Sequence, residues 1–338
     1  MIKFSMQVLK KLWIVVIVVI FLFAGYTFIP SKKVVEENIV LAKLEKDREN
    51  TKKEDDILIM AEKGGYLLEP ENTKRAFDRV FKNSNVDIVE LDIRTTLDGK
   101  LVLIEDETIN RLALAEDAEP VYVNKTNLTD LQKYNLGENF KSLDGVYSYR
   151  GSDRFSAQYL TLMTFESFLS NYKTHASTRL FVLDFQETGE AGQNAVKKAV
   201  ELLERESYEK FLDSVILSSS DAEMVNWLAK EYSEKYAVSG DGEVTTSLLN
   251  ACKYGFKIFN NPVYSVVQYE MKEQGLFGIK YNTARKSFVH KIEEKNMALI
   301  FRNVNTEEGI EKLHGIGTHV IGTGNYELAH STISDLSK

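Results

Sequence analysis

The sequence predicts an α/β fold, a (β/α)8 TIM barrel preceded by an N-terminal transmembrane helix. Short apolar runs rich in β-branched residues alternate with amphipathic helical segments from residue 57 onward. About eight such strands over 57–338 favour a closed parallel barrel over an open sheet. A separate stretch of 18 uncharged residues, 12–29, stands near the N-terminus and has the length of a membrane span.

The composition is that of a folded globular protein. The chain has 338 residues, of which 43% are hydrophobic and 27% charged, so a disordered chain and a multi-span transporter are excluded. The net charge of -8 argues against a nucleic-acid partner, because phosphate binding needs clustered cations. The single cysteine, Cys252, excludes a disulfide framework and a thiolate zinc site.

The N-terminal region predicts attachment to the cell membrane. As a helix, residues 12–29 would span about 27 Å at ~1.5 Å per residue. Three lysines in the short basic segment 1–11 favour a cytoplasmic N-terminus, which places the barrel outside the cytoplasm. A cleaved signal peptide is the alternative, but the apolar run is long for one. Residues 30–56 carry many charges of both signs with a partial apolar stripe, and we interpret them as a charged helical stalk before the barrel, 57–338.

The elements of the barrel follow from periodicity and capping residues. Apolar, β-rich runs predict strands, and amphipathic stretches that begin at Ser, Thr, Asn or Asp predict helices. The expected strands cover 57–61, 86–94, 100–106, 180–185, 214–219, 236–240, 256–260, 278–281, 298–304 and 318–323. The expected helices cover 72–83, 128–134, 164–172, 191–207, 221–235, 244–253, 263–274, 286–295 and 306–314.

The strand ends point to the functional residues. In (β/α)8 barrels the active site lies at the carboxyl ends of the strands. The polar residues at or just after the apolar runs are Glu62, Glu90, Asp92, Glu105, Asp184, Ser218 and Asn303.

Two stretches carry a resemblance to a known family. AEKGGYLLEPENTKRAF is followed by VDIVELDIRTTLDGKLVLIEDETINR. Together they resemble the glycerophosphodiester phosphodiesterase family, whose members typically read A-H-R-G-G, P-E-N-T and then E-x-D-x-x-x-T-x-D-G-x-x-V-x-x-H-D. Together with weaker matches later in the chain, the resemblance covers nearly all of 57–325. It implies a (β/α)8 barrel that hydrolyses glycerophosphodiesters with two histidines, a phosphate-gripping arginine and Ca²⁺ or Mg²⁺.

The chemical positions of this family are substituted in the chain. Glu62 and Glu105 stand at the two histidine positions, and Lys63 stands at the arginine position. None of the five histidines falls at a motif position, and FRNVN replaces the family's W-T-V-N. By the resemblance, the metal ligands are Glu90, Asp92 and Asp184, and further pocket residues are Glu71, Asn72, Asp106 and Gln186, the last at a lysine position.

The substituted residues set the chemistry that we expect. Histidine exchanges protons near neutral pH, whereas a glutamate needs burial or a neighbouring anion to raise its pKa before it can act as an acid. Crowded carboxylates also repel a phosphodiester unless a cation balances them. Glu90 and Asp92 lie two apart on one strand and so point the same way, which is a good start to a Ca²⁺ or Mg²⁺ site.

Three functional hypotheses follow. The first is a membrane-anchored, outward-facing and degenerate family member that binds a ligand or partner at the cell envelope. The second is an active metal-dependent phosphodiesterase that uses Glu62 and Glu105 as acid and base on glycerophosphodiesters, lipid headgroups or teichoic-acid-like polymers. The third is a two-carboxylate hydrolase of glycans.

Overall fold

Eight parallel strands close into a barrel in the computed structural model. It describes residues 13–18, 33–51, 56–83, 85–152, 159–254, 262–271, 274–276, 279–281 and 283–337. The barrel strands are β1 (Leu58–Ala61), β2 (Ile88–Thr95), β4 (Leu180–Phe185), β5 (Val215–Ser219), β6 (Ala237–Gly240), β7 (Val266–Glu270), β10 (Ala298–Arg302) and β11 (Val320–Thr323). Strand β1 pairs with both β11 and β2, which closes the sheet. The predicted (β/α)8 barrel is confirmed.

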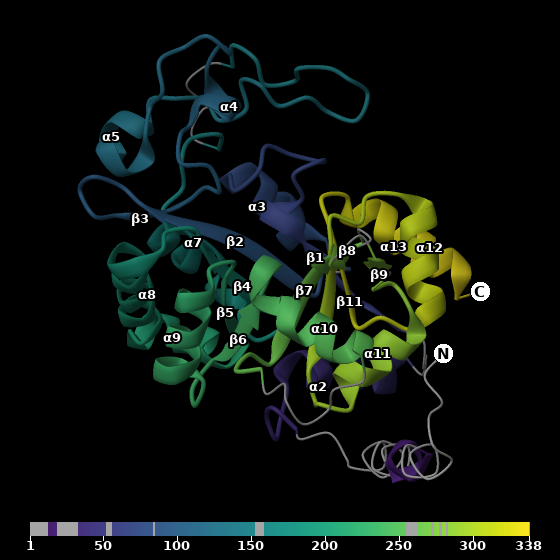
Figure 1. Cartoon of the computed structure of the whole chain (residues 1–338). Coiled ribbons are helices and arrows are strands. Elements are labelled where there is room, and N and C mark those ends of the chain that lie inside the picture. The colour runs from purple at the N-terminus through teal and green to yellow at the C-terminus, as the bar shows by residue number, and fades with distance from the viewer. Residues whose placement is uncertain are drawn as a thin grey trace, which may run out of the picture.

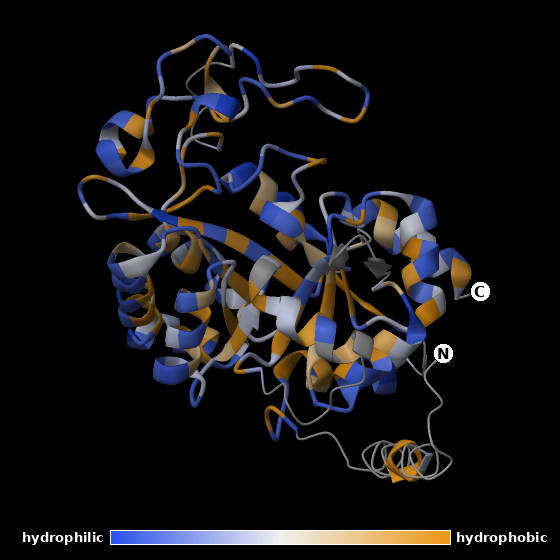
Figure 2. Cartoon of the chain, in the orientation of Figure 1, coloured by the Kyte–Doolittle hydropathy of each residue, from blue (hydrophilic) through white to orange (hydrophobic). Residues whose placement is uncertain are grey.

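Helices surround the strands (Figure 1). They are α3 (Lys74–Lys82), α7 (Phe165–Tyr172), α8 (Gly189–Leu203), α9 (Ala222–Tyr232), α10 (Thr246–Tyr254), α11 (Lys286–Glu293), α12 (Glu307–Ile316) and α13 (Tyr326–Leu336). Several begin at a side-chain cap, as where Thr73 accepts a hydrogen bond from the backbone of Ala76 and Asp221 from that of Met224. In Figure 2 the helices are largely blue on their outward faces, and the strands that they cover are largely orange. This distribution follows the amphipathic pattern of the sequence.

The barrel interior has an apolar layer and a polar layer. Alternate residues of each strand point inward, so the amino-terminal halves bury a cluster that includes Leu58, Val182, Ile216 and Ile300. Nearer the carboxyl ends, the buried polar side chains are Glu90, Asp92, Asp184, Ser218, Ser239 and Gln268. The sequence therefore places a core at one end of the barrel and chemistry at the other, which we call the mouth.

Helix α2 (Ile39–Thr51) closes the end opposite the mouth. Val40 and Leu44 are 0% and 2% exposed and belong to the apolar cluster of the barrel interior. Asn38 donates a hydrogen bond to the carbonyl of Ser265, 2.9 Å away, directly before β7. The charged segment 30–56 thus contains a helix that is packed against the barrel as part of its core.

A long segment between β3 (Leu101–Leu103) and α7 lies over the mouth side of the barrel (Figure 1). Strand β3 pairs antiparallel with β2, and the segment holds α4 (Asn110–Ala113) and α5 (Leu128–Leu131). It has its own apolar cluster, which includes Ile109 and Leu136. 3-10 helices complete the described fold: η1 (Glu62–Gly64), η2 (Val123–Lys125), η3 (Lys173–His175), η4 (Glu206–Ser214) and η5 (Gly242–Thr245).

One predicted helix is wrong. Residues 263–274 contain β7, which pairs with β6 and β10 in the barrel. The run Val266, Val267, Gln268, Tyr269 has strong strand formers, and its alternation puts Gln268 inside the barrel. The predicted strand 256–260 lies outside the described residues. Residues 278–281 overlap β9 (Ile279–Tyr281), which pairs with β8 (Gln274–Leu276) in a two-stranded ribbon separate from the barrel sheet.

The predicted membrane anchor lies mostly outside the described residues. Of 12–29, the structure describes 13–18, which are helical with exposed side chains from Trp13 to Val18. In the described part of the chain, every helix is too short or too polar to cross a bilayer. The basic segment 1–11 also lies outside the described residues.

Candidate functional site

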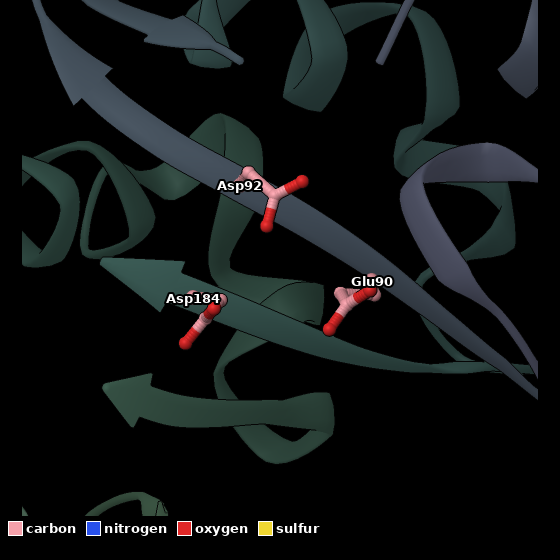
Figure 3. Close-up of side chains that lie close together, drawn as sticks. All are labelled: Glu90, Asp92 and Asp184. Atoms are coloured by element: carbon pink, nitrogen blue, oxygen red, sulfur yellow. The ribbon is translucent and has the colours of Figure 1, made fainter. Parts of the chain in front are cut away.

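Three carboxylates meet at the mouth of the barrel (Figure 3). Glu90 and Asp92 extend from β2, and Asp184 extends from β4, where it is the register partner of Asp92. One oxygen from each of the three lies within 4.8 Å of the others. All three side chains are buried because the strands that carry them are covered on both faces.

Amide groups orient two of these carboxylates. Asn72 donates to Asp92 Oδ2 at 2.8 Å, and Gln186 donates to Asp92 Oδ1 at 3.1 Å and to Asp184 Oδ2 at 2.7 Å. Asn72 holds a positive φ of 55°, which asparagine tolerates better than most residues. In contrast, neither Glu90 oxygen accepts a hydrogen bond from the described residues, although Oε1 lies 2.7 Å from Arg302 Nη2 in an ion pair.

This donor set fits a divalent cation. Oxygen ligands from carboxylates suit Ca²⁺ and Mg²⁺, and buried anions are costly unless positive charge balances them. Glu90 has an oxygen that is both buried and without a hydrogen bond, and Glu90, Asp92 and Asp184 converge on one space. The three would hold the ion, which would supply positive charge against an anionic ligand.

Glu62 is held at the end of β1 by its neighbours across the mouth. It is 1% exposed, and both of its carboxylate oxygens accept from the backbone N–H of Asn303, at 3.0 and 3.2 Å. Arg302 Nε lies 3.3 Å from Glu62 Oε1. Asn303 makes this contact with a positive φ of 57°, which asparagine tolerates better than most residues, as at Asn72.

Lys63 and Glu105 form an ion pair beside the cluster. Lys63 Nζ lies 2.5 Å from Glu105 Oε2, and the Lys63 backbone has a positive φ of 53°. Burial raises the pKa of Glu105, but the hydrogen bond and charge of Lys63, together with the charges of Arg111 and Arg302, outweigh burial, so this pKa is lowered. Burial lowers the pKa of Lys63, but the nearby Asp92 and Glu71 raise it on balance.

Glu71 and Asp106 bind an arginine rather than line an open pocket. Arg111 contacts Glu71 through two hydrogen bonds, of 3.0 and 2.7 Å, and contacts Asp106 at 2.6 Å. Because Arg111 belongs to α4, this fork ties the segment over the mouth to the loop after β1.

The buried acids of the mouth hold their protons more strongly than exposed acids do. Burial raises the pKa of Asp92 to about 7 and raises the pKa of Glu62, Glu90 and Asp184 as well, although Arg302 opposes these last three shifts. Glu62 and Glu105, the residues at the histidine positions, therefore shift in opposite directions.

Arg302 and Asp241 are site residues that the sequence interpretation did not include. Arg302 is the last residue of β10 and points into the mouth, where its Nη1 lies 2.8 Å from Asp241 Oδ2 and its Nη2 2.7 Å from Glu90 Oε1. Strand alternation could have found it, since Arg302 shares the inward face of Ala298 and Ile300. The five histidines lie elsewhere, on helices or near the amino ends of strands.

Two of the hollows in the described surface lie toward opposite ends of the barrel. One of about 410 Å³ adjoins Gln186 and is lined in part by Arg94, Tyr122 and Lys125. Another, of about 580 Å³, lies at the end opposite the mouth between α2 and α13 and shares no residue with the acidic cluster. The first hollow reaches the cluster through Gln186, which donates to Asp92 and Asp184.

Comparison with known proteins identifies the family. The profile of the glycerophosphoryl diester phosphodiesterase family matches residues 63–328. A glycerophosphodiester phosphodiesterase of Caldanaerobacter subterraneus subsp. tengcongensis is 36% identical over 83 residues, which are 25% of this chain and 32% of that protein. The matched segments span only 23% to 32% of the first three curated relatives.

Solved structures show the same fold. A putative glycerophosphoryl diester phosphodiesterase from Silicibacter pomeroyi aligns with a TM-score of 0.63 and 12% identity, over 83% of this chain and 94% of that one. An Oleispira antarctica phosphodiesterase, solved with its product sn-glycerol-3-phosphate, aligns with a TM-score of 0.61 and 15% identity, over 82% and 96% of the two chains. The family profile covers most of the sequence, and the chain belongs to the glycerophosphoryl diester phosphodiesterase family.

Proposed function

We propose that this protein is a degenerate member of its family that binds a phosphodiester ligand at the cell envelope and does not carry out histidine-dependent hydrolysis. One observation carries the proposal. The glutamates at both histidine positions are already engaged, Glu62 by Asn303 and Arg302 and Glu105 by Lys63.

Engaged carboxylates are poor proton-transfer groups. A general acid or base must reach the proton that it moves, at about 2.6–3.2 Å from the reacting atom. Glu62 is 1% exposed and accepts from a backbone N–H on both oxygens, so using it would break those bonds. Glu105 is more exposed, but its charge is paired with Lys63. These contacts support a binding site over a hydrolytic one.

The same mouth has the parts to hold a phosphodiester. Lys63 provides a partly buried ammonium, and a divalent cation on the three carboxylates would add positive charge beside it. The adjoining hollow of about 410 Å³, with Arg94, Tyr122 and Lys125 in its lining, offers room for the rest of the ligand. The ligand class is a glycerophosphodiester, a lipid headgroup or a teichoic-acid-like envelope polymer.

The place of action is the outer face of the cell membrane. The apolar run 12–29 and the lysines before it support a single-pass anchor with the barrel outside the cytoplasm. Protease treatment of intact cells tests this: we expect the barrel to be degraded while a cytoplasmic marker survives. A protected barrel, or one released free of membranes on fractionation, would contradict the anchored topology.

The activity test uses the purified full-length chain in detergent micelles. We expect no release of glycerol 3-phosphate from glycerophosphocholine with Ca²⁺, Mg²⁺ or Mn²⁺. We expect calorimetry to detect binding of a glycerophosphodiester or of glycerol-phosphate polymer. Lys63→Gln should abolish this binding, and Lys133→Gln, on an exposed lysine, should not. Absence of binding to every one of these probes would refute the proposal.

The second candidate, an active metal-assisted phosphodiesterase, is favoured by the opposite pKa shifts of Glu62 and Glu105. Two carboxylates whose pKa values are pushed apart can serve as acid and base. Release of glycerol 3-phosphate that is lost in both Glu62→Gln and Glu105→Gln would establish this alternative and overturn the first.

A further inference from the structure

Arg302 occupies an unusual place for a cation, inside the acidic mouth. Its side chain is 13% exposed, and it extends from the end of β10 toward the carboxylates of other strands. Nη2 lies 2.7 Å from Glu90 Oε1, Nη1 lies 2.8 Å from Asp241 Oδ2, and Nε lies 3.3 Å from Glu62 Oε1. All three nitrogens of the guanidinium are therefore directed at carboxylates.

Glu90 is the carboxylate that Arg302 shares with the cation cluster. Asp92 and Asp184 have amide donors, from Asn72 and Gln186, that hold their oxygens in the cluster. Glu90 has none among the described residues; its Oε1 faces Arg302, and its Oε2 is buried without a hydrogen bond. Of the three carboxylates, Glu90 is thus the one whose position depends on which cation it faces.

We propose that Arg302 is an internal competitor of the divalent cation for Glu90. With Arg302 on Glu90, the cluster offers a metal ion two well-oriented carboxylates, and a third that is already neutralised. A metal ion that recruits Glu90 must displace the guanidinium from it, because the two positive charges repel at such close range. Asp241 and Glu62 can retain the displaced Arg302, so the exchange leaves no cation unpaired.

The inference rests on the cation site of the proposed function but not on ligand binding or on loss of hydrolysis. The test is calorimetric titration of the purified full-length chain in micelles with Mg²⁺, Ca²⁺ and Mn²⁺ separately. We expect Arg302→Gln to lower the metal Kd at least about tenfold relative to the wild type. Arg302→Lys should lower it less, because one ammonium cannot contact three carboxylates as a planar fork can.

The matched control is Arg111→Gln. Arg111 is also a mouth arginine paired with two carboxylates, Glu71 and Asp106, but it lies outside the cluster of three. The substitution Arg111→Gln removes the same charge as Arg302→Gln, but the metal Kd of this variant should stay within about twofold of the wild type. An equal gain in Arg111→Gln would show a general charge effect and overturn the proposal.

A second readout guards against misfolding of the variants. The rise in Tm on adding metal should be larger in Arg302→Gln and Arg302→Lys than in the wild type. Unchanged or weaker metal binding in both variants would overturn the proposal. Absence of metal binding in every variant would overturn the competition between Arg302 and the metal ion and would also refute the cation site. Release of glycerol 3-phosphate, in contrast, would refute only the proposed loss of hydrolysis.

Discussion

Arg302 Nη2 lies 2.7 Å from Glu90 Oε1, and the pair joins two strands, β10 and β2, that are not neighbours in the barrel. The contact therefore crosses the interior of the mouth. Burial lowers the pKa of Arg302, but the charges of Glu90, Glu62, Asp241 and Asp184 together outweigh burial and hold that pKa well above its ordinary value, so the guanidinium stays charged. The mouth thus contains a permanent cation of its own among its acids.

Helix α2 should be needed for a stable barrel. Leu44 is 2% exposed inside the apolar cluster, so Leu44→Ala should lower the free energy of unfolding by about 2–5 kcal/mol. Leu143→Ala, at a leucine that is 65% exposed, should change it by less than about 0.5 kcal/mol. Urea denaturation measures both. Equal stability of the two variants would mean that α2 does not contribute to the core.

Asp87 should make stability fall as the pH rises. Burial raises the pKa of Asp87 from 3.8 to about 6. Lys43 and the backbone N–H of Ile59 oppose this rise, and Asp47 adds to it. Arg179 also lies near Asp87. Between these two pKa values the folded state binds a proton that the unfolded state has lost. The contribution of Asp87 to the free energy of unfolding is therefore complete below about pH 4 and is lost as the pH rises past 6. The loss amounts to up to about 3 kcal/mol.

The measurement for Asp87 is a difference between two proteins. Subtracting the unfolding free energy of Asp87→Asn from that of the wild type removes the other titrating groups. We expect this difference to decrease from pH 4 to pH 7. A difference that is flat over this range would show that Asp87 titrates alike in the folded and unfolded states.

Arg111 should hold the segment over the mouth. Replacing it by lysine keeps the charge but removes the two-bond fork to Glu71 and the contact to Asp106 in its present geometry. Amide hydrogens over 106–118 should then exchange about tenfold faster in Arg111→Lys. Arg150→Lys, at an exposed pair with Glu138, is the control and should leave that exchange unchanged. Equal protection from amide exchange in both variants would show that the contacts of Arg111 do not hold this segment.

Restoring the family's residues should not by itself restore its chemistry. In the triple variant Glu62→His/Lys63→Arg/Glu105→His, we expect no release of glycerol 3-phosphate from glycerophosphocholine with Mg²⁺ or Ca²⁺. The reason is that Arg302 would still pair with Glu90. Release should need the additional change Arg302→Gln. Turnover by the triple variant alone would show that Arg302 does not block the site.

Local patterns in the sequence determined most of the architecture. The alternation of β-branched runs and amphipathic helices predicted the barrel, and the run LFVLDF predicted β4 at its observed bounds. Period-two alternation also placed Glu90 and Asp92 on one face of one strand. The same reasoning missed β7, because the apolar spacing of 263–274 suits a helix as well as a strand.

The tertiary structure alone decided the partners of the charged residues. Nothing local indicates that Arg302 pairs with Glu90, which lies 212 positions earlier in the chain, or that Glu62 accepts from Asn303. It also decided that α2, a highly charged helix in sequence, buries Val40 and Leu44 under the barrel. The physical reason is that periodicity reports which face of an element is buried, whereas closure of the barrel determines which buried faces meet.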